Sequence, residues 1–139
     1  MFDIVLVGAD NSPTAKRAIE AAVEIVLMSG GTLHLVTAFA FKKMGESSAD
    51  SGVFTNEGDA DAALQVLSFI PKNRGVEPVL HLVSGDPAQV IIDTADAVGA
   101  DLIVVGNRGM KGTRRVLGSV PNSVAHGANC SVAIIDTSE

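Results

Sequence analysis

The sequence predicts an α/β fold in which a five-stranded parallel sheet is covered by helices on both faces. Short runs rich in Val, Ile and Leu alternate along the chain with longer segments whose apolar residues recur at helical spacing. Such alternation is typical of parallel strands joined by right-handed helical crossovers. The short runs are apolar at successive positions, as expected for strands that are buried on both faces.

The totals indicate one globular domain spanning residues 1–139, with 47% hydrophobic and 19% charged residues. The formal net charge of −6 disfavours binding to nucleic acid or to an anionic membrane. No apolar run has the length of a bilayer span, and no basic leader-like segment precedes the first apolar run, so we expect a cytoplasmic protein without a membrane partner. Cys130 is the single cysteine, which excludes an internal disulfide and agrees with a reducing compartment.

The first predicted unit is a strand, a turn and a helix. Phe2–Val7 reads FDIVLV and forms the strand, and Gly8–Pro13 supplies turn residues. Asn11 or Ser12 is suited to cap the helix, with Pro13 in its first turn. The apolar positions of this helix are Ala15, Ala18, Ile19, Ala22, Val23 and Val26, and its stop is Gly30 with Gly31.

The second unit contains a long loop. Thr32–Phe39 is the second predicted strand, and residues 40–58 show no period, so we interpret them as a loop. A helix is expected to begin at Asn56 or Glu57 and to continue to about residue 73, because its apolar residues keep the helical interval. Pro71 is expected to fray its last turn.

The remaining elements repeat the pattern. Pro78–Val83 is the third strand, and Ser84–Pro87 is a capping segment before a helix over Ala88–Val98, which Gly99 ends. Asp101–Val105 is the fourth strand. The last two predicted elements are a helix over Val116–Ala128 and a fifth strand over Ser131–Ile135.

A glycine-rich basic loop follows the fourth strand and has the composition of an anion site. It contains four of the ten Lys and Arg residues of an otherwise acidic chain. Glycines let backbone N–H groups approach phosphate oxygens closely, and Gly118-Ser119 precedes a helix whose N-terminus favours an anion. The alternative is that these glycines only form a tight turn and a cap. The glycines of the loop are Gly106, Gly109 and Gly112, and its basic residues are Arg108, Lys111, Arg114 and Arg115.

A second signal converges on the same place. In open parallel sheets, ligands bind beyond the carboxyl ends of the strands where the strand order reverses. If the order is 3-2-1-4-5, strands one and four meet there, and Asp10 and Gly106 face one crevice. The P-loop motif is absent, the dinucleotide fingerprint does not follow the first strand, and hydrolase signatures such as GxSxG and HExxH are missing.

These residues resemble the universal stress proteins, whose ATP-binding members carry Gly-x2-Gly, about nine residues, and Gly-Ser or Gly-Thr after strand four. Gly106, Gly109 and Gly118-Ser119 match this pattern. The intervening segment Met110–Leu117 has eight residues, one fewer than usual, which leaves AMP or cyclic AMP as alternatives to ATP. The resemblance extends from Asp10 to the last strand. It implies a three-layer α/β/α, Rossmann-like fold of the adenine nucleotide alpha hydrolase-like type, with strand order 3-2-1-4-5.

The resemblance also implies residue roles. Asp10 would contact the ribose or adenosine end, the Val36 backbone the adenine edge, and the glycines with Ser119 the ribose and phosphates, usually with Mg²⁺. No residue is assigned as catalytic or as a metal ligand. The nucleotide-binding residues implied in this way are Ala9, Asp10, Val36, Gly106, Arg108, Gly109, Gly118, Ser119 and Val120.

Other readings of the same residues remain open. Asp10 is also suited to cap a helix, and the three histidines, His34, His81 and His126, fit structural roles better than catalytic ones. We expect a regulatory, stress-response module that binds a nucleotide; slow ATP hydrolysis and a ligand-free dimeric scaffold are the alternatives. A homodimer is expected in every case, because strand five, within Cys130–Asp136, would be an unpaired apolar edge.

Overall fold

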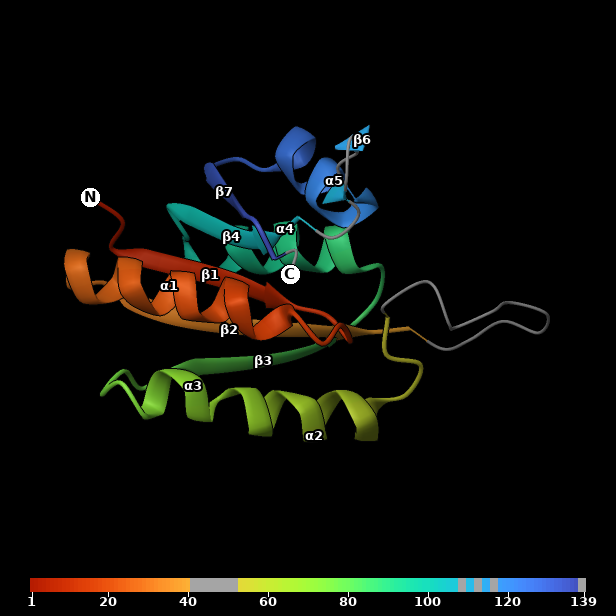
Figure 1. Ribbon diagram of the computed structural model, residues 1–139, viewed down its shortest axis with the longest axis horizontal. Helices are drawn as coiled ribbons and strands as arrows, with labels where there is room; N and C mark the ends of the chain where they lie inside the picture. The colour runs from red at the N-terminus through yellow and green to blue at the C-terminus, as the bar shows by residue number, and fades with distance from the viewer. Residues whose placement is uncertain (41–52, 108–109, 112–113, 116–117, 138–139) are drawn as a thin grey trace.

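A parallel sheet with helices on both faces forms the body of the protein (Figure 1). The computed structural model describes residues 1–40, 53–107, 110–111, 114–115 and 118–137. The five sheet strands lie in the order β3-β2-β1-β4-β7, which confirms the predicted order 3-2-1-4-5. They are β1 (Ile4–Ala9), β2 (Thr32–Phe39), β3 (Val79–Ser84), β4 (Leu102–Gly106) and β7 (Ser131–Ile135).

The strands are in a register that brings their carboxyl ends to one edge of the sheet. In the β1–β2 pair, Gly8 lies opposite Val36 and Ala9 opposite Thr37. The β4–β7 pair ends with Gly106 opposite Ile135. β1 has the six residues predicted but begins and ends two residues later, so it includes the first two residues of the expected turn, because both continue the ladder with β2.

Each face of the sheet packs against its own set of helices. α1 (Ala15–Ser29), α2 (Glu57–Leu67) and α3 (Phe69–Lys72) contribute to one core with Val5, Val7 and Leu35 of the sheet. α4 (Pro87–Val98) and α5 (Ser119–Gly127) contribute to the other core with Leu6, Val36 and Ile103. Alternate residues of each strand therefore enter opposite cores, as the run of consecutive apolar residues predicts.

The predicted single helix over residues 56–73 is wrong, because the structure has two helices separated at Ser68. Pro71 has no backbone N–H, and its ring conflicts with the carbonyl four residues earlier, at Leu67. The break therefore falls upstream of the proline, where Ser68 Oγ donates to the Gln65 carbonyl at 2.6 Å. The helix start is as predicted, with the Asn56 side chain accepting from the Asp59 N–H.

The predicted cap of the first helix is also wrong. The N-cap of α1 is Thr14, without a side-chain cap hydrogen bond, and Pro13 lies before the helix. The reason is local: the Ser12 N–H donates to the Asp10 carboxylate at 2.9 Å, which forms a turn ahead of the helix. In contrast, α4 begins as predicted, with an Asp86 side chain accepting from the Gln89 N–H and Pro87 at its start.

The segment between β4 and α5 differs from the expected loop. Its described residues form a short antiparallel ladder between β5 (Met110–Lys111) and β6 (Arg114–Arg115). α5 begins at Ser119 rather than at the predicted Val116, and residues 116–117 lie outside the described residues. None of the helices in the described part of the chain is long and apolar enough to span a membrane.

Candidate functional site

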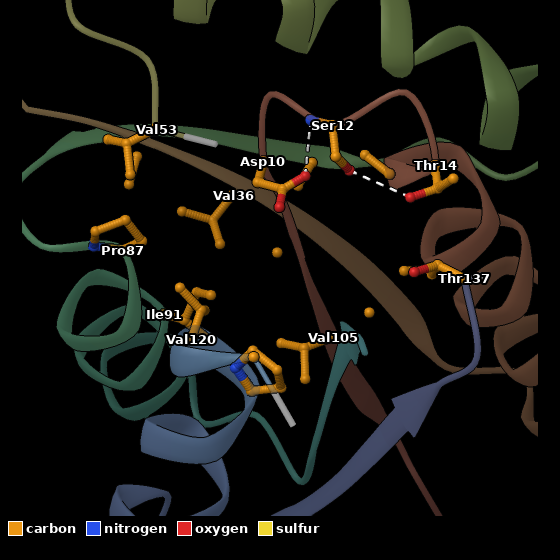
Figure 2. Close-up of a pocket in the computed structure, with 18 of the residues that line it drawn as sticks. Asp10, Ser12, Thr14, Val36, Val53, Pro87, Ile91, Val105, Val120 and Thr137 are labelled. Atoms are coloured by element: carbon orange, nitrogen blue, oxygen red, sulfur yellow. Dashed lines mark hydrogen bonds between the residues drawn. The ribbon is translucent and has the colours of Figure 1, made fainter. Parts of the chain in front are cut away.

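A cavity of about 400 Å³ lies at the carboxyl ends of β1, β2 and β4 (Figure 2). Its size falls in the range of pockets that hold small ligands and cofactors. Residues from both helical layers reach it, since α1 contributes its N-terminal end and α4 and α5 contribute their first turns. The position at the point of strand-order reversal between β1 and β4 is the one expected for a ligand in such a sheet.

One half of the pocket is apolar. Figure 2 shows Val36, Val53 and Pro87 on this side, with Ile91 and Val120 beneath them. A flat apolar group, such as an aromatic ring, would lose its contact with water here without leaving a buried polar group unpaired.

The width of the pocket at its base depends on a glycine in β1. A β-carbon at Gly8 would lie 2.6 Å from Ile91 Cδ1, so β1 and α4 approach each other closely only because this side chain is absent. Ile91 is almost fully buried and lines the same pocket. The contact therefore sets how far α4 stands from the sheet at the site.

The other half of the pocket carries oxygen atoms. The Asp10 side chain points into the cavity, and one of its oxygens accepts from the Ser12 N–H. The hydroxyls of Ser12 and Thr14 lie 3.4 Å apart beside it. Asp10 therefore orders the turn before α1 rather than capping that helix, and it presents negative charge to the cavity.

Thr137 closes this polar half from beyond the end of β7 (Figure 2). Its N–H donates to Asn107 Oδ1 at 2.8 Å, and its hydroxyl donates to the same oxygen at 3.1 Å. Asn107 Nδ2 donates to Asp136 Oδ1 at 3.2 Å. Asn107 thus ties the segment after β4 to the segment after β7, and both Asn107 and Thr137 are buried.

The N-terminus of α5 forms a third part of the site. Gly118, Ser119 and Val120 line the cavity, and no side chain caps the helix. Pro121 has no N–H, so the first-turn donors are those of the residues before it. An acceptor placed at this end would meet backbone N–H groups, the Ser119 hydroxyl and the positive end of the helix dipole.

Most of the residues predicted from the sequence line this one cavity. Those that do are Ala9, Asp10, Val36, Gly106, Gly118, Ser119 and Val120. Arg108, Gly109 and Gly112 lie outside the described residues. The backbones of Lys111, Arg114 and Arg115 lie in the β5–β6 ladder.

Sequence reasoning missed several pocket residues. Thr137 lines the pocket and Asn107 is its hydrogen-bond partner behind the wall; both lie next to predicted elements, but no motif marks them. Ile91 fell in the predicted helix over Ala88–Val98, and Val53 fell in the presumed loop. Its neighbour Phe54 pairs with Phe39, the last residue of β2, and this pairing brings Val53 to the pocket. Pro87 had a local signal, because a helix that starts directly after a parallel strand begins at the ligand edge of the sheet.

Two of the three histidines meet outside this site. His34 Nδ1 and His81 Nε2 are 2.9 Å apart across β2 and β3, and the two rings are within 19° of parallel. Burial lowers the pKa of both side chains, and the neighbouring His81 lowers that of His34 further. Both shifts favour the neutral form of the rings, and in a neutral pair one ring donates to the other, as expected for a structural pair.

The described residues do not form a protein cage for a metal. Across the described ranges, no group of three or more His, Cys, Asp or Glu residues is placed to hold an ion. Asp10 is the only carboxylate among the described pocket residues. A Mg²⁺ ion at this site would consequently depend on ligand phosphates and water for most of its coordination.

Comparisons with known proteins bear on the family of this chain. The sequence matches the family model described as "Universal stress protein family" over residues 1–136. Universal stress protein A homolog 1 of Coxiella burnetii is 31% identical over 140 residues, covering 94% of each chain. A universal stress protein of Mycobacterium tuberculosis is 30% identical over 149 residues, covering 98% of this chain and 97% of its own.

Solved structures show the same fold. The crystal structure of a universal stress protein in complex with cAMP has 31% sequence identity and a TM-score of 0.78, and the match covers 99% of each chain. The universal stress protein from Archaeoglobus fulgidus in complex with dAMP has 26% identity and a TM-score of 0.72, with 98% of each chain covered. On the family match and these similarities, this chain belongs to the universal stress protein family.

Proposed function

We propose that this protein binds an adenine nucleotide in the cavity at the ends of β1, β2 and β4 and acts as a regulatory, stress-response module in the cytoplasm. The observation that carries the proposal is the division of one cavity into an apolar half, an oxygen-lined half and an uncapped helix N-terminus. A nucleotide has three parts with these preferences: base, sugar and phosphate. The cAMP and dAMP complexes of similar proteins support the same ligand class.

The three parts of the ligand have natural positions in the cavity. The base would lie against Val36, Val53 and Pro87, where its faces leave water without leaving a polar group of the protein buried and unpaired. The sugar would lie near Asp10 and Gly106. The phosphates would meet the N–H groups and hydroxyl at Gly118-Ser119. Ala9 and Val120 complete the walls, and Arg108 and Gly109 are proposed phosphate contacts from the family resemblance alone.

Binding rather than turnover is the proposed activity. In-line phosphoryl transfer depends on charge stabilisation and on a group that positions the nucleophile. Asp10 is the only described pocket carboxylate, and one of its oxygens already holds the Ser12 N–H. We propose ATP as the first candidate, with Mg²⁺ carried by its phosphates, and AMP or cyclic AMP as the others.

Calorimetric titration with ATP, AMP and cyclic AMP, each with and without Mg²⁺, tests the proposal. We expect binding of at least one ligand, and no heat with any of them overturns it. Ser119→Ala should lower the affinity for phosphate-bearing ligands about threefold to tenfold, because one neutral hydrogen-bond donor is lost, and should leave the affinity for adenosine unchanged. Ser123→Ala, in the same helix but outside the pocket, is the matched control.

We also propose that the protein is a homodimer through β7. This strand is last in the sheet order, so its outer edge has no partner among the described strands. Ile134 is partly exposed at this edge. An exposed apolar edge favours pairing with a second copy. Light scattering at micromolar concentration should give a dimer mass, and Ile134→Lys should give a monomer; a monomer mass for the unaltered protein rejects the proposal.

A further inference from the structure

The orientation of the Asn107 amide is determined from both of its ends. Its oxygen faces the Thr137 N–H at 2.8 Å, and its NH₂ faces a carboxylate oxygen of Asp136 at 3.2 Å. Exchanging the two atoms would place a donor against an N–H and an acceptor against a carboxylate, so this alternative is excluded. Asn107 Oδ1 is therefore the atom beside the Thr137 hydroxyl.

This orientation determines the polarity of the Thr137 hydroxyl. A hydroxyl has one hydrogen, and Thr137 Oγ1 donates it to Asn107 Oδ1 at 3.1 Å. Only its lone pairs are left for other partners. Because Thr137 is 4% exposed and lines the cavity, those lone pairs are shielded from bulk water and available to a ligand. At this wall the cavity therefore presents a hydrogen-bond acceptor, although threonine can ordinarily act as either.

The position of this acceptor relative to the rest of the site is also informative. A β-carbon built on Gly106 would lie 2.9 Å from Thr137 Cγ2 and 3.5 Å from Oγ1, so the threonine stands directly beside that glycine. Asp10, another acceptor, lies on the same polar half of the cavity (Figure 2). Phosphate oxygens are mostly deprotonated at neutral pH and would gain little from an acceptor here. A nucleotide offers two kinds of donor, the N6 amine of adenine and the sugar hydroxyls. The base is placed against Val36, Val53 and Pro87 in the apolar half, so the sugar hydroxyls are the donors expected on the polar half.

We propose that Thr137 determines specificity by accepting a hydrogen bond from a ribose hydroxyl, with Asn107 as the positioning residue that keeps the threonine in its acceptor state. The inference rests on the proposed nucleotide function and goes beyond it, since it assigns a preference between ribose and deoxyribose. A site built to bind a hydroxyl rejects the analogue that lacks it, because a buried acceptor is then left unpaired.

The test uses three probes: AMP, 2′-deoxy-AMP and 3′-deoxy-AMP. Titration of the unaltered protein should show that removal of one of the two hydroxyls weakens binding about tenfold, as expected for one buried hydrogen bond. Thr137→Val keeps the shape of the side chain and the backbone N–H bond to Asn107 but removes the acceptor. This variant should bind AMP more weakly by about the same factor and bind the affected deoxy analogue with unchanged affinity, so that the protein no longer discriminates between the two. Thr137→Ser keeps the hydroxyl and should keep the discrimination.

The outcomes separate the two proposals. If the unaltered protein binds none of the three probes or the other adenine nucleotides, the proposed function fails. If it binds AMP and both deoxy analogues equally, or if Thr137→Val weakens all three probes by the same factor, nucleotide binding stands and the role of Thr137 is overturned. Retained binding of the deoxy analogue by Thr137→Val shows that the variant is folded.

Discussion

The close approach of β1 and α4 at the base of the pocket predicts that Gly8→Ala destabilises the protein. In a strand, alanine is ordinarily better than glycine by about 0.5–1 kcal/mol, because the unfolded chain loses less entropy. At Gly8, however, the new β-carbon would lie 2.6 Å from Ile91 Cδ1 and 3.0 Å from Cγ1. Ile91 is 6% exposed and its Cγ1 as well as its terminal Cδ1 meets the new atom, so the whole side chain has to move; overpacking of this kind costs about 1–3 kcal/mol. The steric cost exceeds the entropic gain, and we expect a net loss of about 1 kcal/mol.

A second substitution isolates this contact. Ile91→Val removes the Cδ1 atom and alone should cost about 0.5–1.5 kcal/mol. With Cδ1 absent, the nearest contact is the 3.0 Å approach of Cγ1, which a small shift relieves. Gly8→Ala should then be nearly neutral in the Ile91→Val background. The coupling free energy of the pair is expected to be about 1 kcal/mol, the usual size for two residues in contact.

Urea unfolding followed by far-ultraviolet circular dichroism measures all four proteins, since the chain has no Trp or Tyr for fluorescence. Gly58→Ala is the matched control, because a β-carbon there meets only Asn56 Oδ1 at 3.5 Å, and it should not destabilise the protein. A cost for Gly8→Ala that is the same with Ile and with Val at position 91 would refute the steric explanation.

Three further predictions concern titratable or unpaired groups. The pKa of His34 and of His81 is lowered in the folded protein, so their neutral pair stabilises the fold above about pH 6.5 and this contribution is lost as the pH falls. The urea midpoint of unfolding should therefore drop between pH 7 and pH 5. The drop should be smaller in His81→Gln. Thr37 Oγ1 is buried without a hydrogen-bond partner among the described residues, so Thr37→Val should raise stability by about 1 kcal/mol in the same assay. Burial raises the pKa of the Cys130 thiol, with the Asp96 and Asp101 carboxylates adding to it; iodoacetamide at pH 8 should react slowly until urea unfolds the protein.

Each of these has a contrary result. A pH dependence unaltered by His81→Gln would show that the pair is not its source. A loss of stability in Thr37→Val would show that the hydroxyl is bonded in solution. Labelling of Cys130 in the folded protein at the rate of a free thiol would contradict the shift in its pKa.

The helices show where sequence reasoning succeeded and where it did not. α4 was predicted well because its signals are local: Asp86 accepts from an N–H three residues on, Pro87 fits the first turn, and Gly99 takes the left-handed conformation that ends the helix. The break after Leu67 was missed because the conflict that Pro71 causes acts four residues upstream. The cap of α1 was misplaced because the Asp10 carboxylate takes the Ser12 N–H, a competition that composition alone does not resolve.

The order of its apolar runs, glycines and caps was enough to predict this protein's α/β class and the glycine-rich loop and Asp10 as parts of a candidate site. The resemblance to its family added the strand order and the roles of the site residues. Those signals are local or periodic along the chain, so they can be recognised from the sequence alone. Only the tertiary structure decided the rest of the site. Asn107 and Thr137 are 30 residues apart, and the bond that makes the threonine an acceptor exists only once β4 and β7 pair. The same holds for Gly8 and Ile91, whose contact depends on how α4 packs on the sheet.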